Sequence, residues 1–261
     1  MFEWKECVLM EIKILHLYPD LMNLYGEYGN LNLLQSWLKE QKIDVSIDKK
    51  SIGDKFSFSS YDFIYCGSGT ENNFEVALND LKKKKAELED FINLNRCALF
   101  TGNSIEFFGN KLIKTDKSEE DLLNFLHFDV ERLDDRKTSD VILESSIFKS
   151  DVVGFINKQA NLIFRDDVTR DDYKPDNVLN LFKVKFGIGG DSENIREGFK
   201  KNNLIATYTI GPVLVRNPEF ANYIIGAIIK SKDKNFEIKN ISHPNEEKGY
   251  ELVLKELQNR K

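Results

Sequence analysis

The N-terminal half of the chain alternates short apolar runs with longer segments whose apolar residues recur at helical spacing. The short runs are rich in β-branched and aromatic residues and predict strands over residues 11–17, 43–47, 61–66 and 97–100. The longer segments predict helices over residues 30–41 and 74–94, the first with one apolar face formed by Leu31, Leu34, Trp37 and Leu38. Strands that alternate with helices in this way predict an α/β fold, with a doubly wound, mostly parallel sheet and helices on both of its faces.

The C-terminal half changes to shorter apolar runs separated by charged turns. Strands are predicted over residues 128–133, 140–143, 152–156 and 204–209, and a helix over residues 217–229. We therefore expect one domain over residues 10–230 and a polar C-terminal tail over residues 231–261, with a short helix near residues 250–257. Residues 1–9 precede the first strand pattern and are either an extension or the result of a start assigned too early.

The composition excludes several classes of function. The 261 residues carry a net charge of −6, so no general positive field is present to hold a nucleic acid. The longest apolar stretch, residues 223–229, is far shorter than the roughly 20 residues that span a bilayer. Three cysteines without Cys-x-x-Cys spacing favour a reducing, cytoplasmic setting, and we expect no metal and no cofactor. The acidic segment Arg165–Asp172 fits no common metal-ligand spacing and is expected to be a solvated loop.

Two glycine-containing turns follow predicted strands and are the places where a ligand is expected. Ligands of doubly wound sheets bind at the carboxyl ends of the strands, where residues 67–69 and 101–104 lie. In the second turn a strand leads directly into a helix, which is the geometry of a nucleophile elbow, in which the tip residue presents its side chain to the pocket. The tip residue here is Gly102, which has no side chain to present.

Five segments resemble, in the same order along the chain, the motifs of one family. They are Tyr18–Asn30 (YPDLMNLYGEYGN), Gly67–Glu71 (GSGTE), Arg136–Asp140 (RKTSD), Gly154–Asn157 (GFIN) and Thr207–Pro218 (TYTIGPVLVRNP). Over roughly residues 12–230 the chain resembles the class I glutamine amidotransferase domains of the cobyric acid synthase type. Within them it is most similar to small subunits that act with a Mur-ligase-like synthetase in cell-wall amidation, a step of peptidoglycan biosynthesis. The resemblance implies a flavodoxin-like topology and glutamine hydrolysis as the activity of the family.

The residues that depart from the family pattern are those that carry its chemistry. Aligned through Gly109, the family motif C-G-G-Y-Q-L-L-G places the nucleophilic cysteine at Gly102. The motif T-Y-L-H-G-P places the base histidine at Ile210, and another family histidine falls at Lys158. Hydrolysis of glutamine by this route needs a thiolate and an imidazole that act as a unit. Because neither group is present at these positions, the sequence predicts that glutaminase activity is absent.

The resemblance also assigns a substrate-binding site. Its glycine-rich turn and the N–H of the residue after the nucleophile would form the oxyanion hole, and an arginine would recognise the polar end of glutamine or of a similar small molecule. The residues at these positions are Gly67, Ser68, Gly69, Asn103 and Arg136. Arg136 equally fits a surface arginine beside Asp134 and Asp135. Glu106 replaces a family glutamine and disfavours ordinary glutamine binding, because it adds a negative charge near the site.

Three functions are compatible with the sequence. The first is a catalytically degenerate amidotransferase-like subunit bound to a Mur-ligase-like synthetase, with aromatic contacts such as Tyr18, Tyr25 and Tyr28 at the interface. The second is an active glutamine amidotransferase that supplies ammonia to a muramyl-peptide or cobyric-acid-type ligase through other residues. The third is a free-standing small-molecule-binding protein that kept only the fold. The missing cysteine and histidine favour the first function over the second.

Overall fold

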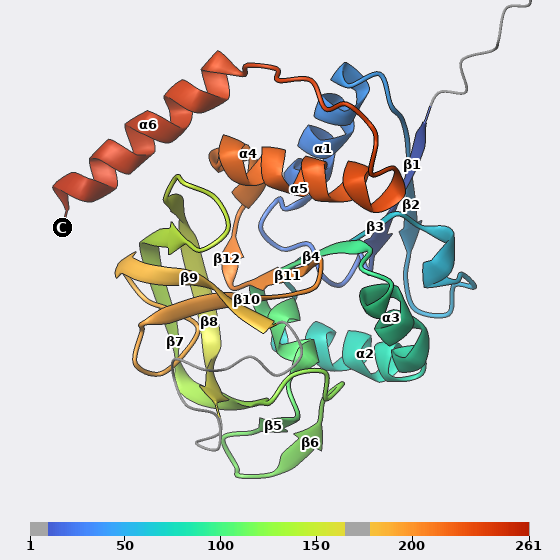
Figure 1. Cartoon of the computed structure of the whole chain (residues 1–261). Helices are drawn as coiled ribbons and strands as arrows, with labels where there is room; N and C mark the ends of the chain where they lie inside the picture. Colours follow the sequence, from blue (N-terminus) through green and yellow to red (C-terminus); the bar gives the residue numbers. More distant parts are fainter. Residues whose placement is uncertain (1–9, 165–177, 261) are drawn as a thin grey trace, which may run out of the picture.

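The computed structural model describes residues 10–164 and 178–260, which are built around one large sheet (Figure 1). Five of its strands are parallel neighbours in the order β2-β1-β3-β4-β11. Their bounds are β1 Glu11–Leu17, β2 Asp44–Lys50, β3 Phe63–Cys66, β4 Cys97–Thr101 and β11 Leu204–Thr207. This order is the flavodoxin-like arrangement and confirms the predicted doubly wound α/β fold. The predictions for residues 1–9 and for Arg165–Asp172 lie outside the described residues.

Helices cover both faces of this parallel part (Figure 1). On one face lie α1 (Tyr28–Glu40) and α5 (Pro218–Lys232), and on the other lie α2 (Glu71–Lys82) and α3 (Lys85–Asn93). The sequence predicted one helix over residues 74–94, and the structure has two. The first begins earlier because the Thr70 hydroxyl caps it, accepting a hydrogen bond from the Asn73 N–H at 3.2 Å.

The sheet continues on the other side of β11 with antiparallel strands that lengthen it well beyond the parallel part. These strands are β10 Arg196–Lys201, β9 Val178–Phe186, β7 Phe128–Ser145, β8 Val152–Phe164 and β12 Thr209–Ile210, with the small strands β5 Lys111–Ile113 and β6 Glu119–Asp121 beside β7. The sequence predicted two short strands where β7 is one long strand. The middle of this strand is charged and solvent-exposed, and its pairing with β8 has a register irregularity between Arg132 and Lys137. This segment therefore resembles a turn in composition although the strand continues through it.

The C-terminal segment is more ordered than the predicted polar tail with a short helix. Helix α6 (Pro244–Asn259) has 16 residues and begins earlier than expected, with Pro244 in its first turn. It packs against the sheet through Leu257, which contacts Ile142 of β7 and Val153 of β8. The Tyr250 hydroxyl donates a 2.8 Å hydrogen bond to the main chain of Asp151. The predicted short helix was wrong in extent, because the few apolar residues of α6 form a narrow stripe that looks polar on average.

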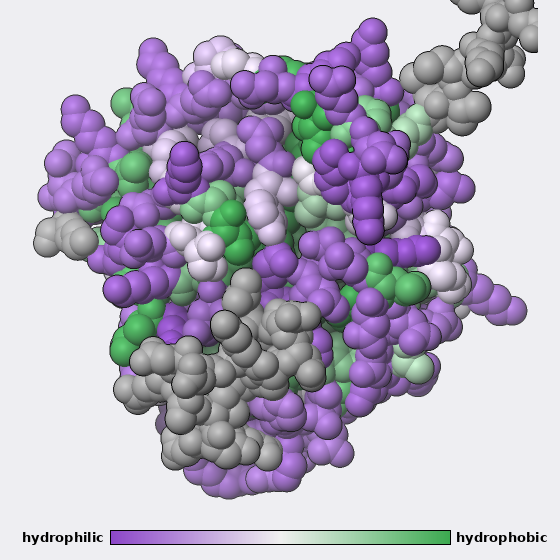
Figure 2. All heavy atoms as spheres, in the orientation of Figure 1, coloured by the Kyte–Doolittle hydropathy of each residue, from purple (hydrophilic) through white to green (hydrophobic). Residues whose placement is uncertain are grey.

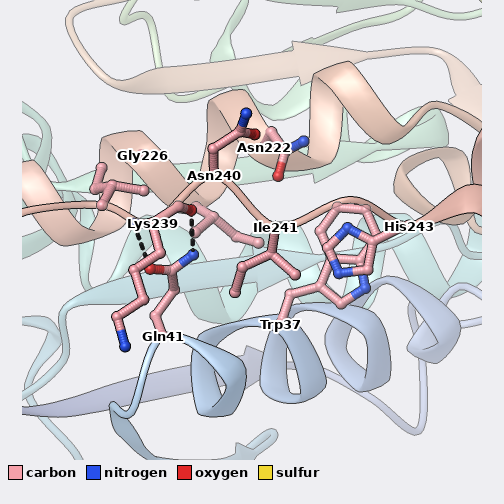
Figure 3. Close-up of a pocket in the computed structure, with 10 residues that line it drawn as sticks. Trp37, Gln41, Asn222, Gly226, Lys239, Asn240, Ile241 and His243 are labelled. Carbon is pink, nitrogen blue, oxygen red and sulfur yellow. Dashed lines mark hydrogen bonds between the residues drawn. The ribbon is translucent and has the colours of Figure 1, made fainter.

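The connection from α5 to α6 is held against α1 (Figure 3). The Gln41 side-chain amide donates to the Lys239 carbonyl and accepts from the Lys239 N–H, both at 2.8 Å. The His243 ring stacks on Trp37 with 3.6 Å between the ring centroids. These contacts line a cavity of about 260 Å³ on the α1 and α5 face, away from the carboxyl ends of the strands.

Most of the face seen in Figure 2 is hydrophilic, with hydrophobic residues in scattered groups. Strands β3 and β4, in contrast, are completely buried, as expected for central strands covered on both faces. Across residues 10–164 and 178–260, no helix combines the length and the apolar character needed to cross a bilayer.

Candidate functional site

The opening segment packs directly onto the first glycine turn at the carboxyl ends of the strands. A Cβ atom added to Gly67 would lie 2.6 Å from the main-chain oxygen of Met22, and one added to Gly69 would lie 2.7 Å from that of Leu21. Real Cβ atoms do not approach oxygen so closely, so these two positions accept only glycine. The Leu24 N–H also donates a 3.0 Å hydrogen bond to the carbonyl of Ser68. Two of the motifs singled out in the sequence therefore form one surface in the fold.

Gly102 lies at the tip of the second turn, between Ser68 and Ile210. Its φ of +65° is in the left-handed region, as expected at the strained tip of an elbow. A Cβ added there would lie 2.3 Å from the Ser68 Cβ, 2.5 Å from the Ser68 Oγ and 2.9 Å from the Ile210 Cγ2. The residues predicted to replace the nucleophile and the base are thus neighbours. The space that a side chain at position 102 would enter is filled by Ser68.

Three of the main-chain donors assigned to the oxyanion hole, those of Ser68, Gly69 and Asn103, have acceptors within the protein. The Ser68 N–H donates to the Glu27 carboxylate at 2.6 Å, and the Gly69 N–H donates to the Asn103 side-chain oxygen at 2.9 Å. The Asn103 N–H points to the Ser68 hydroxyl at 3.5 Å. The predicted residues are therefore brought together, but their hydrogen-bonding groups are used by the protein itself. Their role in binding a substrate stays a prediction.

Glu27 is the centre of a buried polar network that the sequence analysis missed. It accepts a 2.6 Å hydrogen bond from the Thr101 hydroxyl, which lies 3.0 Å from the Tyr65 hydroxyl. The Asn30 amide donates to Tyr65 at 3.0 Å and accepts from the Leu214 N–H at 2.9 Å. Burial raises the pKa of Glu27 to about 7. The only signal for this residue was its acidic character within the YGEYGN part of the opening motif.

A second buried polar group lies behind the elbow, around Glu106. The Arg132 guanidinium donates to the Glu106 carboxylate at 2.6 Å and the Tyr208 hydroxyl donates to it at 3.1 Å. Burial raises the pKa of Glu106, and the nearby Arg132 opposes that rise. Lys158, in the place of a family histidine, donates to the Gly190 carbonyl at 3.0 Å, and burial lowers its pKa to about 8. Glu106 therefore forms an internal ion pair with Arg132, which the sequence analysis did not identify as its partner.

Arg136 lies at the outer edge of the site, with 40% of its side chain exposed. It donates to Glu71 at 2.6 Å and to the side-chain oxygens of Asn157 and Gln159 at 3.1 Å. The Asn157 amide in turn donates to the Tyr25 hydroxyl at 3.0 Å. Four of the five motifs therefore meet at this cluster and the glycine turn. Within this cluster the Arg136 guanidinium forms an ion pair with the Glu71 carboxylate.

The three tyrosines expected at an interface differ in how far they are exposed. Tyr18 is completely buried and donates a 2.8 Å hydrogen bond to Asp80, so its prediction as a surface anchor was wrong. The residue follows a strand directly and turns into the core instead of outward. Tyr25 is half-buried, and Tyr28 is 55% exposed beside Leu24, which is 49% exposed.

Three side chains near the two turns, those of Cys66, Cys97 and Ser104, carry a thiol or hydroxyl that could replace the missing nucleophile, and all three are buried. Cys66 and Cys97 have no exposed surface, and burial raises the pKa of Cys97 to about 12 and that of Cys66 well above its usual range. The Ser104 hydroxyl donates to the Thr101 carbonyl at 2.7 Å. His16 is buried in β1, where desolvation lowers its pKa to about 4. None of these groups has the exposed, electropositive surroundings that activate a thiol or hydroxyl.

The buried carboxyls predict a loss of stability as the pH rises. Like Glu27, Glu197 is buried, which raises its pKa to about 7, and it accepts hydrogen bonds from Thr207 and from the Tyr208 N–H at 2.7 and 2.6 Å. Because these pKa values exceed that of an unfolded glutamate, the folded state binds more protons between about pH 4.5 and pH 7. Each carboxyl should therefore reduce the free energy of unfolding by about 3 kcal/mol as the pH rises through this range.

Urea unfolding measured at several pH values between about 5 and 8 checks this expectation. Relative to the wild type, Glu27→Gln should remove most of the roughly 3 kcal/mol that this carboxyl contributes to the pH dependence, whereas Glu251→Gln on the exposed face of α6 should leave the pH dependence unchanged. Because burial lowers the pKa of His16 to about 4 and opposes this fall in the wild type, the difference between variant and wild type is the measure, and an unchanged pH dependence in Glu27→Gln would contradict the assignment.

An elbow at the carboxyl end of a central parallel strand, faced by a glycine turn, is the arrangement expected of an amidotransferase-like α/β domain. The chain belongs to the CobB/CobQ-like glutamine amidotransferase domain family, whose model matches residues 13–218. A relative from Staphylococcus aureus (strain N315), named lipid II isoglutaminyl synthase (glutamine-hydrolyzing) subunit GatD, is 29% identical over 244 residues and covers 94% of this chain and 95% of its own. The protein of the same name from Streptococcus pneumoniae (strain ATCC BAA-255 / R6) is 26% identical over 223 residues, 85% of this chain and 82% of its own.

Solved structures agree on the fold. A glutamine amidotransferase from Thermotoga maritima superimposes with a TM-score of 0.51 at 13% identity, covering 95% of this chain and 97% of its own. Another structure described as a glutamine amidotransferase has a TM-score of 0.52 at 12% identity and covers 82% of this chain and 98% of its own. These likenesses confirm the predicted class I amidotransferase-like fold.

Proposed function

We propose that this chain is an amidotransferase-like subunit without glutaminase activity that acts with a synthetase in lipid II amidation. The observation that carries the proposal is the arrangement at the elbow tip. Gly102 offers no nucleophile, Ile210 beside it offers no base, and Ser68 fills the space that a side chain at position 102 would enter. The names of the two relatives, each a subunit of a lipid II isoglutaminyl synthase, support the reaction and the existence of a partner.

The partner in this proposal is a Mur-ligase-like synthetase, and the subunit contributes contacts instead of chemistry. The exposed side chains Leu24 and Tyr28 lie on the opening segment, beside the glycine turn to which Leu24 is hydrogen-bonded. Apolar and aromatic residues of this kind are enriched at protein interfaces. A genome neighbour of the Mur-ligase type would provide the partner to test, and a stable complex on size exclusion is the expected result.

An active amidotransferase working through other residues is less well supported. Its nucleophile would have to be Cys66, Cys97 or Ser104, and all three are buried. As for a free-standing binding protein, no ligand-specific arrangement within residues 10–164 and 178–260 favours it over the subunit.

The isolated chain is expected to release neither ammonia nor glutamate from glutamine above background. It should also resist labelling by the glutamine-like electrophile diazo-oxo-norleucine, because an acyl-thioester cannot form at Gly102. Glutamate release followed by a coupled assay and intact mass spectrometry after labelling check both expectations. Stoichiometric modification of Cys66, Cys97 or Ser104 would overturn the proposed lack of activity.

A further inference from the structure

The Asn103 side chain makes a paired contact with the glycine turn. Its carboxamide oxygen accepts from the Gly69 N–H at 2.9 Å and from the Ser68 hydroxyl at 3.2 Å. Its carboxamide nitrogen donates to the Gly69 carbonyl at 2.9 Å. Both polar groups of the Gly69 residue are therefore engaged by one carboxamide, and Asn103 is 7% exposed.

This carboxamide is the same functional group as the side-chain end of glutamine. It lies one residue after the elbow tip and is bound by a main-chain N–H of the turn opposite. A reacting carboxamide at an elbow would place its oxygen on such main-chain donors. The side chain of asparagine is one methylene shorter than that of glutamine. The main chain of Asn103 lies close enough to the turn for its carboxamide to reach Gly69.

Ser68 completes the closure from the other side of the tip. Its Cβ occupies the space that a side chain at position 102 would need, and its main-chain N–H is held by Glu27. Glu27 also accepts a hydrogen bond from the Thr101 hydroxyl and is completely buried, so it holds the turn from the interior of the protein. Asn103 and Glu27 thus provide hydrogen-bond partners for Ser68 and Gly69 of the turn without a ligand.

We propose that Asn103 is an internal substitute for the glutamine carboxamide and that, with Ser68, it excludes glutamine from the elbow. The inference rests on the proposed function and deepens it: the site is not an empty remnant but is closed by its own side chains. Loss of the nucleophile and loss of substrate binding then involve different residues of this chain. Substrate binding can be restored without restoring the nucleophile.

Binding of L-glutamine to the whole chain, measured by isothermal titration calorimetry, tests the exclusion. Wild type should show no heat of binding at millimolar glutamine, whereas Ser68→Gly/Asn103→Gly should bind it. Ser68→Ala/Asn103→Gly is the matched control, because alanine keeps the Cβ that blocks the tip, and it should bind at least about tenfold more weakly than the double glycine variant. Binding by wild type equal to that of the double variant, or no binding by a folded double variant, would overturn the inference.

Amide hydrogen exchange gives a second test that needs neither ligand nor the double variant. The Gly69 N–H should be protected in wild type, and Asn103→Ala should speed its exchange by about three- to tenfold, the effect of losing one hydrogen bond. Fast exchange of Gly69 in wild type would overturn the inference. Glutaminase activity of the wild-type chain would instead contradict the proposed function, so the two failures can be distinguished.

Discussion

Arg132→Met should lower the free energy of unfolding by about 3–5 kcal/mol, because it leaves the Glu106 carboxylate buried without its counter-ion. The Arg132 side chain is 9% exposed and that of Glu106 is 1% exposed, so water cannot replace the lost partner. Among the residues that the structure describes, the Tyr208 hydroxyl is the donor that would remain on the carboxylate after the change. Urea unfolding monitored by circular dichroism measures the difference.

Two controls separate this effect from a general loss of charge. Arg132→Met combined with Glu106→Gln removes both charges and should recover most of the stability, since a neutral side chain is much less costly to bury. Arg260→Met removes a surface ion pair to Asp140, with side chains 52% and 41% exposed, and should cost less than about 1 kcal/mol. Equal costs for Arg132→Met and Arg260→Met would mean that the buried pair contributes nothing.

A thiol placed at the elbow should report on residue 210 through its pKa. Gly102→Cys needs Ser68→Gly as well, because the Ser68 Cβ would lie 2.3 Å from the new Cβ. Adding Ile210→His then places an imidazole beside the thiol, and a neighbouring imidazole lowers a thiol pKa by about one unit or more. Below that pKa, each unit raises the reactive thiolate fraction about tenfold.

The pH profile of iodoacetamide labelling at residue 102 measures this change. The triple variant with Ile210→His should reach half-maximal labelling at a lower pH than the double variant that keeps Ile210. A triple variant with Ile210→Gln should behave like the double variant, because glutamine does not titrate. Identical profiles for the histidine and glutamine variants would show that residues 102 and 210 are not within reach of each other. The alignment behind the account would then fail.

The sequence was sufficient for the parallel part of the fold because its strands are short, apolar and closed by turn residues. The long strand β7 was not foreseen, since Asp134, Asp135 and Lys137 give its middle the composition of a turn while neighbouring strands hold it in the sheet. Tertiary pairing, which decides such cases, leaves no local signal. For the same reason α6 was underestimated: its contact with β7 and β8 joins residues more than 100 positions apart.

At the site, the sequence identified the important positions but not their partners. The neighbourhood of Gly102 and Ile210 was implied by the family resemblance of the two motifs that contain them. The roles of Glu27, Ser68 and Asn103 did not, because each depends on a hydrogen bond to a residue at least 34 positions away. Tyr18 is buried whereas Tyr28 is exposed, and no periodicity in the sequence distinguishes the two residues.

The source of the nitrogen in the amidation reaction tests the central claim most directly. The chain is purified with the Mur-ligase-like synthetase proposed as its partner and supplied with lipid II, ATP and either amide-¹⁵N glutamine or ¹⁵N ammonium. If the chain has no glutaminase activity, label should enter the product from ammonium and not from glutamine. Incorporation from glutamine that requires this chain and is lost without it would contradict the account.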